Sequence, residues 1–462
     1  MSISDMNNKI LPSLIFSASL SLLAACNDSD NETKTASFVT SPSPSTSSNG
    51  LASQDQVDAE RNALDFISRT EAKTALQNKA QDLLAIAKKY NTPIDDYNLK
   101  LLESSVQESA FASLLTIFNI DVNNEKIVST LAAPHSWFGL NVLGSRTVFD
   151  NPDTTYRTIP IDPNISYIIK GEATTHIPLD VNFSQWDSNN QTLANLATKD
   201  LVRNADGSFE IYVSKSTAPS TYKNSIVLQD KVVKLFIRNT INDWKNQYFD
   251  KLSIERADGS KRVASISTDQ QYQYFLSTAT TAGSAYNYYY QLANAPLVNT
   301  LPEISLGGSA GRLSTQAATY SSFDIADDEA LVYTTTLGGA NYFILPVYNQ
   351  WFITTDYINT TQTLNNAQSI ANADGSYTYV IAKQDPGVYN WINTDGLNRG
   401  YLNPRWQGLS GNTTQVPTAS IQKVKIAALK SVLPSGTKYV KTTERKQQLT
   451  ERKASYQTRY TP

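Results

Sequence analysis

The chain has very little sulfur and very little imidazole. Its 462 residues include one cysteine, Cys26, and two histidines, His135 and His176. A single cysteine forms no disulfide within a chain, and two histidines are too few for the usual zinc sites. An oxygen-only calcium site stays open, but no spacing of acidic residues points to one. We therefore expect no metal and no cofactor, and a fold that is stabilised by packing.

Charge is also sparse. Charged residues make up 18% of the chain and the formal net charge is -3. This balance provides no basic surface, so nucleic acid is not an expected partner. By contrast, the chain contains 25 tyrosines and 6 tryptophans, and 40% of its residues are hydrophobic. Such a composition supports a substantial core and favours a fold rich in β-sheet.

The amino-terminal segment has the pattern of a bacterial lipoprotein signal. Residues 10–25 are apolar but too short to span a membrane, and they lead directly into the lone Cys26. Two alanines immediately before a cysteine are typical of a lipoprotein cleavage site. We expect residues 1–25 to be removed and Cys26 to carry acyl chains such as palmitate, which anchor the protein to a membrane of the bacterial cell envelope. Asn27, rather than an aspartate, favours the outer membrane.

Composition and periodicity divide the rest of the chain into four parts. Residues 26–56 are rich in Ser, Thr, Asn and Pro, which predicts a flexible tether. Residues 57–120 carry apolar side chains at steps of three and four, which predicts a pair of packed helices. Strand patterns dominate afterwards. They predict a first β lobe over residues 121–300 and a second over residues 301–462.

A near-repeat indicates that the two lobes are alike. The sequence Asn-Ala-Asp-Gly-Ser occurs at residues 204–208 and again at residues 372–376, each time before an alternating strand. Asp-Gly is typical of hairpin turns, so we expect each copy to be a hairpin that enters a sheet. The predicted fold class is α+β and mainly β. It comprises two similar antiparallel β-sandwich-like lobes, an N-terminal helical pair and a C-terminal helix.

Two further helices are predicted within the lobes. In the first lobe, an amphipathic helix is expected because Ile237, Ile241, Trp244 and Tyr248 recur at helical spacing. The second lobe is expected to end in a helix over Thr442–Arg459. Arginines recur in it every seven residues, which places them on nearly one side of the helix. We expect them to clamp acidic groups at a sheet edge or to face water.

Six short motifs follow one another along the second part of the chain. They stand at Asn151–Arg157, Asp206–Glu210, Arg238–Trp244, Asp328–Val332, Asp385–Gly396 and Arg405–Trp406. With these motifs in this order, the chain resembles the bacterial family called domain of unknown function 1214 over about residues 137–460. The resemblance implies a mainly β, sandwich-like fold and supplies no established reaction. Leu397-Asn398 depart from the family, whose members tend to have a histidine there.

Some of these motifs combine aromatic, amide and guanidinium groups. Such groups bind sugars and carboxylates by stacking and paired hydrogen bonds. They also suit a buried lock between two lobes. We predict that the protein binds a small molecule or glycan in a cleft between the lobes. The predicted contacts are Asp153, Tyr156, Arg157, Asn390, Trp391 and Arg405.

Two other functions stay open. In a carboxylate-dependent hydrolase of envelope or environmental substrates, two acidic side chains would flank a scissile bond at about 5 to 9.5 Å. A scaffold of the envelope would need no pocket. The position of the acidic side chains relative to a pocket discriminates these functions. The candidate catalytic residues are Asp153, Glu329, Asp385 and Asp395.

Overall fold

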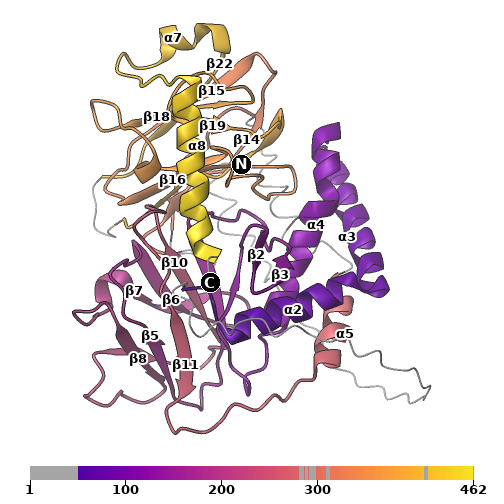
Figure 1. The fold of residues 1–462 in the computed structure, drawn as a ribbon, viewed down its shortest axis with the longest axis vertical. Helices are drawn as coiled ribbons and strands as arrows, with labels where there is room; N and C mark the ends of the chain where they lie inside the picture. Colours follow the sequence, from indigo (N-terminus) through magenta and orange to yellow (C-terminus); the bar gives the residue numbers. More distant parts are fainter. Residues whose placement is uncertain are drawn as a thin grey trace, which may run out of the picture.

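The computed structural model describes residues 50–279, 286, 290, 298–307, 313–409 and 415–460. The expected signal, the lipidation site Cys26 and most of the expected tether lie outside these residues. The described chain forms two β lobes, a helical region beside them and a long helix near its C-terminal end (Figure 1). Within the described residues, no helix is long and apolar enough to cross a membrane.

The described N-terminal region folds into three helices where the sequence predicted two. They are α2 (Gln54–Ser68), α3 (Thr70–Lys89) and α4 (Asp96–Ile117). The extended backbone of Arg69 separates α2 from α3. The Ser53 side chain accepts a hydrogen bond from the Gln56 backbone N–H and so caps α2. The folded body therefore begins before residue 57, the expected end of the tether.

The first lobe consists of two packed sheets. Their shared core contains apolar side chains from both, including Phe183 and Leu235 on one sheet and Ile169 and Phe209 on the other. One sheet has the order β1 (Val128–Thr130), β4 (Thr154–Pro160), β10 (Lys234–Thr240), β6 (Asp180–Trp186) and β7 (Thr192–Ala197). The other has the order β11 (Leu252–Arg256), β5 (Tyr167–Gly171), β8 (Phe209–Ser214) and β9 (Asn224–Val227).

The second lobe also consists of two sheets. One has the order β12 (Ser305–Leu306), β13 (Ala317–Ala318), β21 (Arg405–Gln407), β16 (Tyr342–Tyr348), β20 (Arg399–Leu402) and β14 (Ser321–Asp324), and β17 (Thr363–Asn365) also pairs with β16. The other has the order β19 (Trp391–Asn393), β18 (Tyr377–Ala382), β15 (Glu329–Thr335) and β22 (Ala419–Lys425).

The two lobes share one strand topology, which confirms their predicted similarity. The order β4-β10-β6-β7 in the first lobe corresponds to β14-β20-β16-β17 in the second. The order β11-β5-β8-β9 corresponds to β22-β15-β18-β19. In each lobe the last pair of the second sheet, β8 with β9 and β18 with β19, is parallel.

Both Asn-Ala-Asp-Gly-Ser copies form the same tight turn. Gly207 and Gly375 have φ of 85° and 81°, a region that favours glycine. The Asn204 and Asn372 backbone N–H groups donate to the carbonyls of residues 208 and 376, at 2.8 and 2.7 Å. The prediction of a hairpin was wrong, however. The strands that follow, β8 and β18, pair with β5 and β9 and with β15 and β19, and not with the segment before the turn.

The amphipathic helix predicted around Ile237 does not exist. Residues 234–240 form strand β10, which pairs with β4 and β6 along its whole length. Leu235, Ile237 and Asn239 are buried at every second position, which is the period of a strand. The apparent helical spacing arose because Ile241 and Trp244 lie beyond the strand and are buried at the junction between the lobes.

The C-terminal helix is α8 (Thr442–Gln457), as predicted. Figure 1 shows it running from the second lobe down to the first. It continues into the short helix η5 (Thr458–Tyr460), which contacts β2 (His135–Trp137). The two ends of the described chain thus meet beside the junction. The other described elements are β3 (Leu140–Val142), α5 (Thr268–Ala279), α7 (Leu429–Val432), η2 (Thr198–Asp200), η3 (Asn366–Gln368) and η4 (Ile426–Ala428).

Candidate functional site

A small cavity lies where α2, β2 and η5 meet. Its volume is about 30 Å³, enough for about two water molecules. Aromatic side chains form much of its wall, including Trp137, Tyr456 and Tyr460. Its polar wall includes Glu60, His135 and Arg459. These three side chains come from the beginning, the first third and the end of the described chain.

Glu60 is held rigidly. It lies on the buried face of α2, with 2% of its surface exposed. Trp137 Nε1 donates to Oε2 at 2.6 Å, and Gln56 Nε2 donates to Oε1 at 2.8 Å. A buried carboxylate needs such donors because burial without partners is costly. Both carboxylate oxygens therefore have fixed positions beside the cavity.

His135 presents one ring nitrogen to the cavity. Its Nδ1 lies 2.8 Å from the Ala133 carbonyl oxygen. Because a carbonyl only accepts hydrogen bonds, Nδ1 carries the hydrogen, and the neutral ring keeps its lone pair on Nε2. Nε2 is buried, has no hydrogen-bond partner among the described residues and lies 3.8 Å from Glu60 Oε1. The ring stacks on Tyr460 with centroids 3.9 Å apart.

Arg459 brings two further unpartnered atoms. Its residue is 9% exposed, and Nη1 donates to the Pro152 carbonyl at 2.6 Å. The guanidinium lies over the rings of Trp244 and Tyr456, at 4.6 and 4.4 Å from their centroids. Nε and Nη2 are buried and find no acceptor in the part of the chain that the structure describes. Unpaired buried donors are expensive, and a water molecule or a ligand in the cavity would satisfy them.

Asp153, predicted both as a ligand contact and as a catalytic residue, is a fully bonded link between the lobes. Its Oδ1 accepts from Trp244 Nε1 at 2.7 Å. Its Oδ2 accepts from Tyr342 Oη at 2.9 Å and from Asn365 Nδ2 at 2.8 Å. Burial raises the pKa of this carboxyl, while the hydrogen bonds and Arg459 oppose that effect. Trp244 belongs to the first lobe and Tyr342 to the second, so Asp153 ties them together.

The other predicted contacts of the first lobe also have structural partners. Arg157 donates to the Asp250 carbonyl at 2.7 Å, and burial lowers its pKa to about 10. Tyr156 is half-buried and, as the neighbour of Arg157 on β4, points to the opposite face of that sheet. Arg405 of the second lobe donates to the Asp150 carbonyl at 3.0 Å and to Tyr348 Oη. Its Nε has no partner among the described residues.

Asn390 and Trp391 lie in the second lobe and serve its sheet. The Asn390 amide accepts from the Ile370 N–H at 2.9 Å and donates to the carbonyls of residues 370 and 378. Asn224 makes the same contacts in the first lobe, with residues 202 and 210. Trp391 Nε1 donates to the Ala382 carbonyl at 2.9 Å. The structure does not bring the six predicted ligand contacts together around one pocket in the described chain.

The three remaining candidate catalytic carboxylates are also separated. Glu329 pairs with Lys423, and its pKa is lowered to about 2, chiefly by the hydrogen bond from the Ala326 N–H. Asp385 pairs with Arg445 at 2.9 Å. Asp395 accepts from the Asp356 N–H at 3.2 Å. None of them lines a pocket found in the described residues. That region also holds no group of three His, Cys, Asp or Glu side chains suited to a metal.

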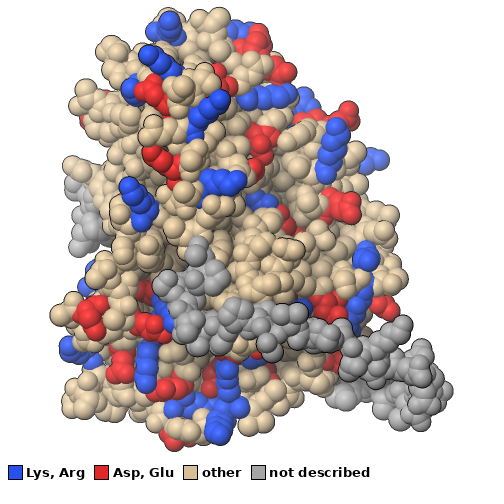
Figure 2. Space-filling model, in the orientation of Figure 1, with Lys and Arg blue, Asp and Glu red and all other residues tan. Residues whose placement is uncertain are grey.

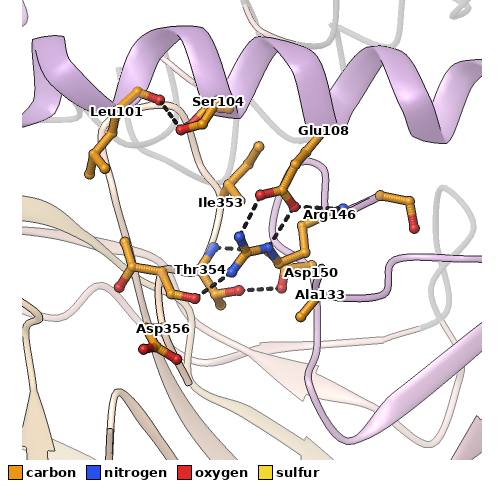
Figure 3. Close-up of polar contacts among 12 residues, drawn as sticks. Leu101, Ser104, Glu108, Ala133, Arg146, Asp150, Ile353, Thr354 and Asp356 are labelled. Carbon is orange, nitrogen blue, oxygen red and sulfur yellow. Dashed lines mark hydrogen bonds and ion pairs between the residues drawn. The ribbon is translucent and has the colours of Figure 1, made fainter. Parts of the chain in front are cut away.

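A polar network supports the segment that carries His135. Figure 3 shows Glu108 reaching from α4 to Arg146, with Asp150 and Thr354 beside them. Arg146 Nε donates to Glu108 Oε2 at 2.7 Å, and the Thr354 N–H donates to Asp150 Oδ1 at 3.0 Å. Burial raises the pKa of Asp150 to about 6, although Arg146 opposes the shift. This network fixes the chain just after β3 against both α4 and the second lobe.

Sequence reasoning did not select Glu60, His135 or Arg459 as a site. One signal was present in the sequence, because Glu60 shares the apolar face of its helix with Val57 and Ala63. The heptad spacing of the arginines was a second signal, although only the last of them, Arg459, lines the cavity. Arg445 pairs with an acidic group, Asp385, which is one of the two positions expected for these arginines.

Comparisons with known proteins show the fold. Neither a family model nor a curated protein matches this chain. The structure is similar to that of an uncharacterized protein from Burkholderia cenocepacia, with a TM-score of 0.64 and 22% identity, over 81% of this chain and 99% of that one. A protein from Vibrio parahaemolyticus aligns with a TM-score of 0.41 and 13% identity, over 60% of this chain and 90% of that one. The chain shares its mixed α+β fold with an uncharacterized bacterial protein.

Proposed function

We propose that this protein is a lipoprotein of the bacterial envelope whose folded body binds a small molecule in the cavity between α2, β2 and η5. The observation that carries the proposal is the set of buried, unpartnered nitrogens on two lining side chains. They are His135 Nε2 and Arg459 Nε and Nη2. Donors and acceptors placed around a small apolar space are the usual composition of a ligand site.

The size of the cavity limits the ligand. About 30 Å³ accommodates a few atoms, so a whole sugar ring does not fit. A small molecule, or the polar end of a larger one, fits better than the glycan that the aromatic motifs suggested. The resemblance to domain of unknown function 1214 supports placing the chain in that family, and it adds no ligand. On the face shown in Figure 2, basic and acidic side chains are interspersed, which offers no broad patch for a polyanion.

The two alternatives have less support. For a hydrolase, two of the four candidate carboxylates would have to flank one pocket, and the described structure places the four in separate ion pairs and hydrogen bonds. A scaffold would need no buried donors without partners. The cavity therefore favours binding over both alternatives.

The test is a thermal-shift screen of the purified full-length protein in detergent, with mass spectrometry of each mixture. The panel comprises small carboxylates, amides, amines, sugars and fatty acids. A ligand at one hundred times its dissociation constant stabilises a fold by about 2.7 kcal/mol. A shift that disappears in Arg459→Gln supports the proposal. A new product mass would indicate a hydrolase instead, and a silent panel would favour the scaffold.

A further inference from the structure

The charges around the cavity are nearly balanced without a ligand. Its lining includes one carboxylate, Glu60, and one guanidinium, Arg459. His135 is the only histidine there, and Tyr357, Tyr456 and Tyr460 are the remaining titratable side chains of the described lining. Just outside the lining, Asp153 acts electrostatically on Arg459, and Arg452 acts on both. With a neutral His135 these two acidic and two basic side chains balance. Protonation of His135 would leave one positive charge in excess.

We propose that the cavity binds a small carboxylate between Arg459 and His135 and that His135 takes up one proton as the carboxylate binds. The inference rests on the proposed function and specifies its ligand class. It follows from the unpartnered nitrogens and from the charge balance of the described lining. The bound state would contain two positive groups, Arg459 and His135, and two negative groups, Glu60 and the ligand.

Arg459 supplies the geometry for a carboxylate. Its Nε and Nη2 lie side by side on one edge of the planar guanidinium group, and both lack acceptors among the described residues. A carboxylate matches this pair of donors with two parallel hydrogen bonds. The aromatic rings under the guanidinium and the bond to the Pro152 carbonyl fix the plane of the fork. A cationic ligand would be repelled by the guanidinium, and a neutral ligand would gain no ionic contact with it.

His135 accounts for the proton. In its neutral form Nε2 holds a lone pair, which would face the lone pairs of an incoming carboxylate. Once protonated, Nε2 becomes a donor to the ligand or to Glu60 Oε1, which lies 3.8 Å away. Histidine is the side chain that makes this change near neutral pH. The carboxylate of Glu60, fixed by Trp137 and Gln56, is placed to stabilise the charged ring.

The first measurement is calorimetric titration of the full-length protein in detergent with acetate and formate. Acetamide and methylammonium serve as neutral and cationic probes of similar size. Acetate and formate should bind, and the two other probes should bind at least tenfold more weakly. If acetamide or methylammonium binds and the carboxylates do not, the carboxylate proposal is wrong while small-molecule binding stands. If no probe binds, the carboxylate proposal fails, and the proposed function fails with it only if the wider thermal-shift panel is also silent.

Matched variants locate the site. Arg459→Gln should weaken acetate binding more than tenfold. Arg445→Gln is the control, since Arg445 is a buried arginine of α8, the helix that continues into η5, and it pairs with Asp385 and does not line the cavity. It should keep the wild-type affinity for acetate even where it lowers stability. Equal losses in the two variants, or unchanged binding in Arg459→Gln, would overturn the assignment.

Calorimetric titration with acetate also measures the proton that His135 takes up. Titrations at pH 7.5 in buffers with different ionisation enthalpies should show uptake of nearly one proton per acetate. Affinity should then fall about tenfold between pH 7.5 and 8.5. His135→Gln should abolish both the uptake and the pH dependence. A wild-type protein that binds acetate without proton uptake would overturn the role of His135.

Discussion

At the scale of single residues, the buried amino group of Lys79 lowers the stability of the helical region. Lys79 on α3 is 7% exposed and donates to Ser109 Oγ on α4 at 3.4 Å. Burial lowers its pKa to about 8. A lowered lysine pKa means that the folded state disfavours the charge, so this residue destabilises the fold increasingly as pH falls from about 10.5 to about 8.

We predict that Lys79→Met stabilises the protein. At pH 7 the gain in unfolding free energy should be about 2 kcal/mol, because the cost of burying the ammonium is removed. The difference should shrink above pH 9. Lys73→Met, at an exposed position of the same helix, is the control and should change stability little. Denaturant unfolding at both pH values measures the effect, and a destabilised Lys79→Met would contradict it.

Asp150 gives a pH dependence of the opposite kind. Burial raises its pKa to about 6 in the folded protein, from an ordinary value near 3.8. The folded state therefore holds the proton more tightly than the unfolded state. The contribution of Asp150 to stability is complete below about pH 4 and is lost as pH rises through 6.

We predict that the stability difference between the wild type and Asp150→Asn changes by about 3 kcal/mol between pH 4 and pH 7. The wild type should lose stability relative to the variant over this range. Parallel denaturant titrations at several pH values provide the measurement. A difference that stays constant with pH would show that Asp150 ionises as freely in the folded state as in the unfolded chain.

At the scale of elements, the two lobes use the same residue type, an asparagine, to pair backbone groups next to their parallel strands. In each, an asparagine at the start of a parallel strand bonds to backbone groups of two neighbouring segments. Asn224 is the first residue of β9, and Asn390 directly precedes β19. The amide replaces ladder bonds that the sheet cannot make at that edge. Asn390 was predicted as a ligand contact, and its structural partners account for its position.

We expect Asn224→Ala and Asn390→Ala to behave alike. Each leaves buried backbone groups without partners and should lower the unfolding free energy by about 2 to 3 kcal/mol. Neither should change the affinity of the cavity for acetate. Chemical denaturation and acetate titration of the two variants test this, and a selective loss of binding in Asn390→Ala would return that residue to the candidate site.

The sequence predicted elements well where one period dominated. The helix over residues 442–459 and the turns at Gly207 and Gly375 follow from heptad spacing and Asp-Gly chemistry. The prediction of a helix around Ile237 was wrong because Ile241 and Trp244, which lie beyond strand β10, completed a helical spacing with it. The site could not be predicted, because Glu60, His135 and Arg459 are far apart in sequence and become neighbours only through the packing of η5 against β2.

At the scale of the whole molecule, some residues that line the cavity follow the expected lipid anchor closely in the sequence. Leu51 and Gln56 line the cavity, and Cys26 precedes them by about 25 residues. A chain of about 25 residues spans at most about 90 Å even when it is fully extended. Anchoring through Cys26 would therefore hold the cavity within about 90 Å of a membrane surface.

We predict that Cys26→Ser releases the protein from the membrane fraction of bacterial cells. Serine lacks the thiol through which the lipid would be attached, so the variant carries no acyl anchor. Cell fractionation and intact-mass measurement of the mature protein provide the test, with the unchanged protein as reference. A serine variant that still sediments with membranes would show that another feature holds it there.

The meeting of the two chain ends at one cavity has a consequence for synthesis. Roughly 400 residues separate Glu60 from Arg459. At about 5 to 20 residues per second, the ribosome needs about 20 to 80 s to add them. Because η5 is the last described element to be made, the cavity lacks its wall on that side until synthesis is nearly complete. A chain that ends before Arg459 would keep the strands of both lobes and would lack the part of the cavity wall that Arg459 and Tyr460 form.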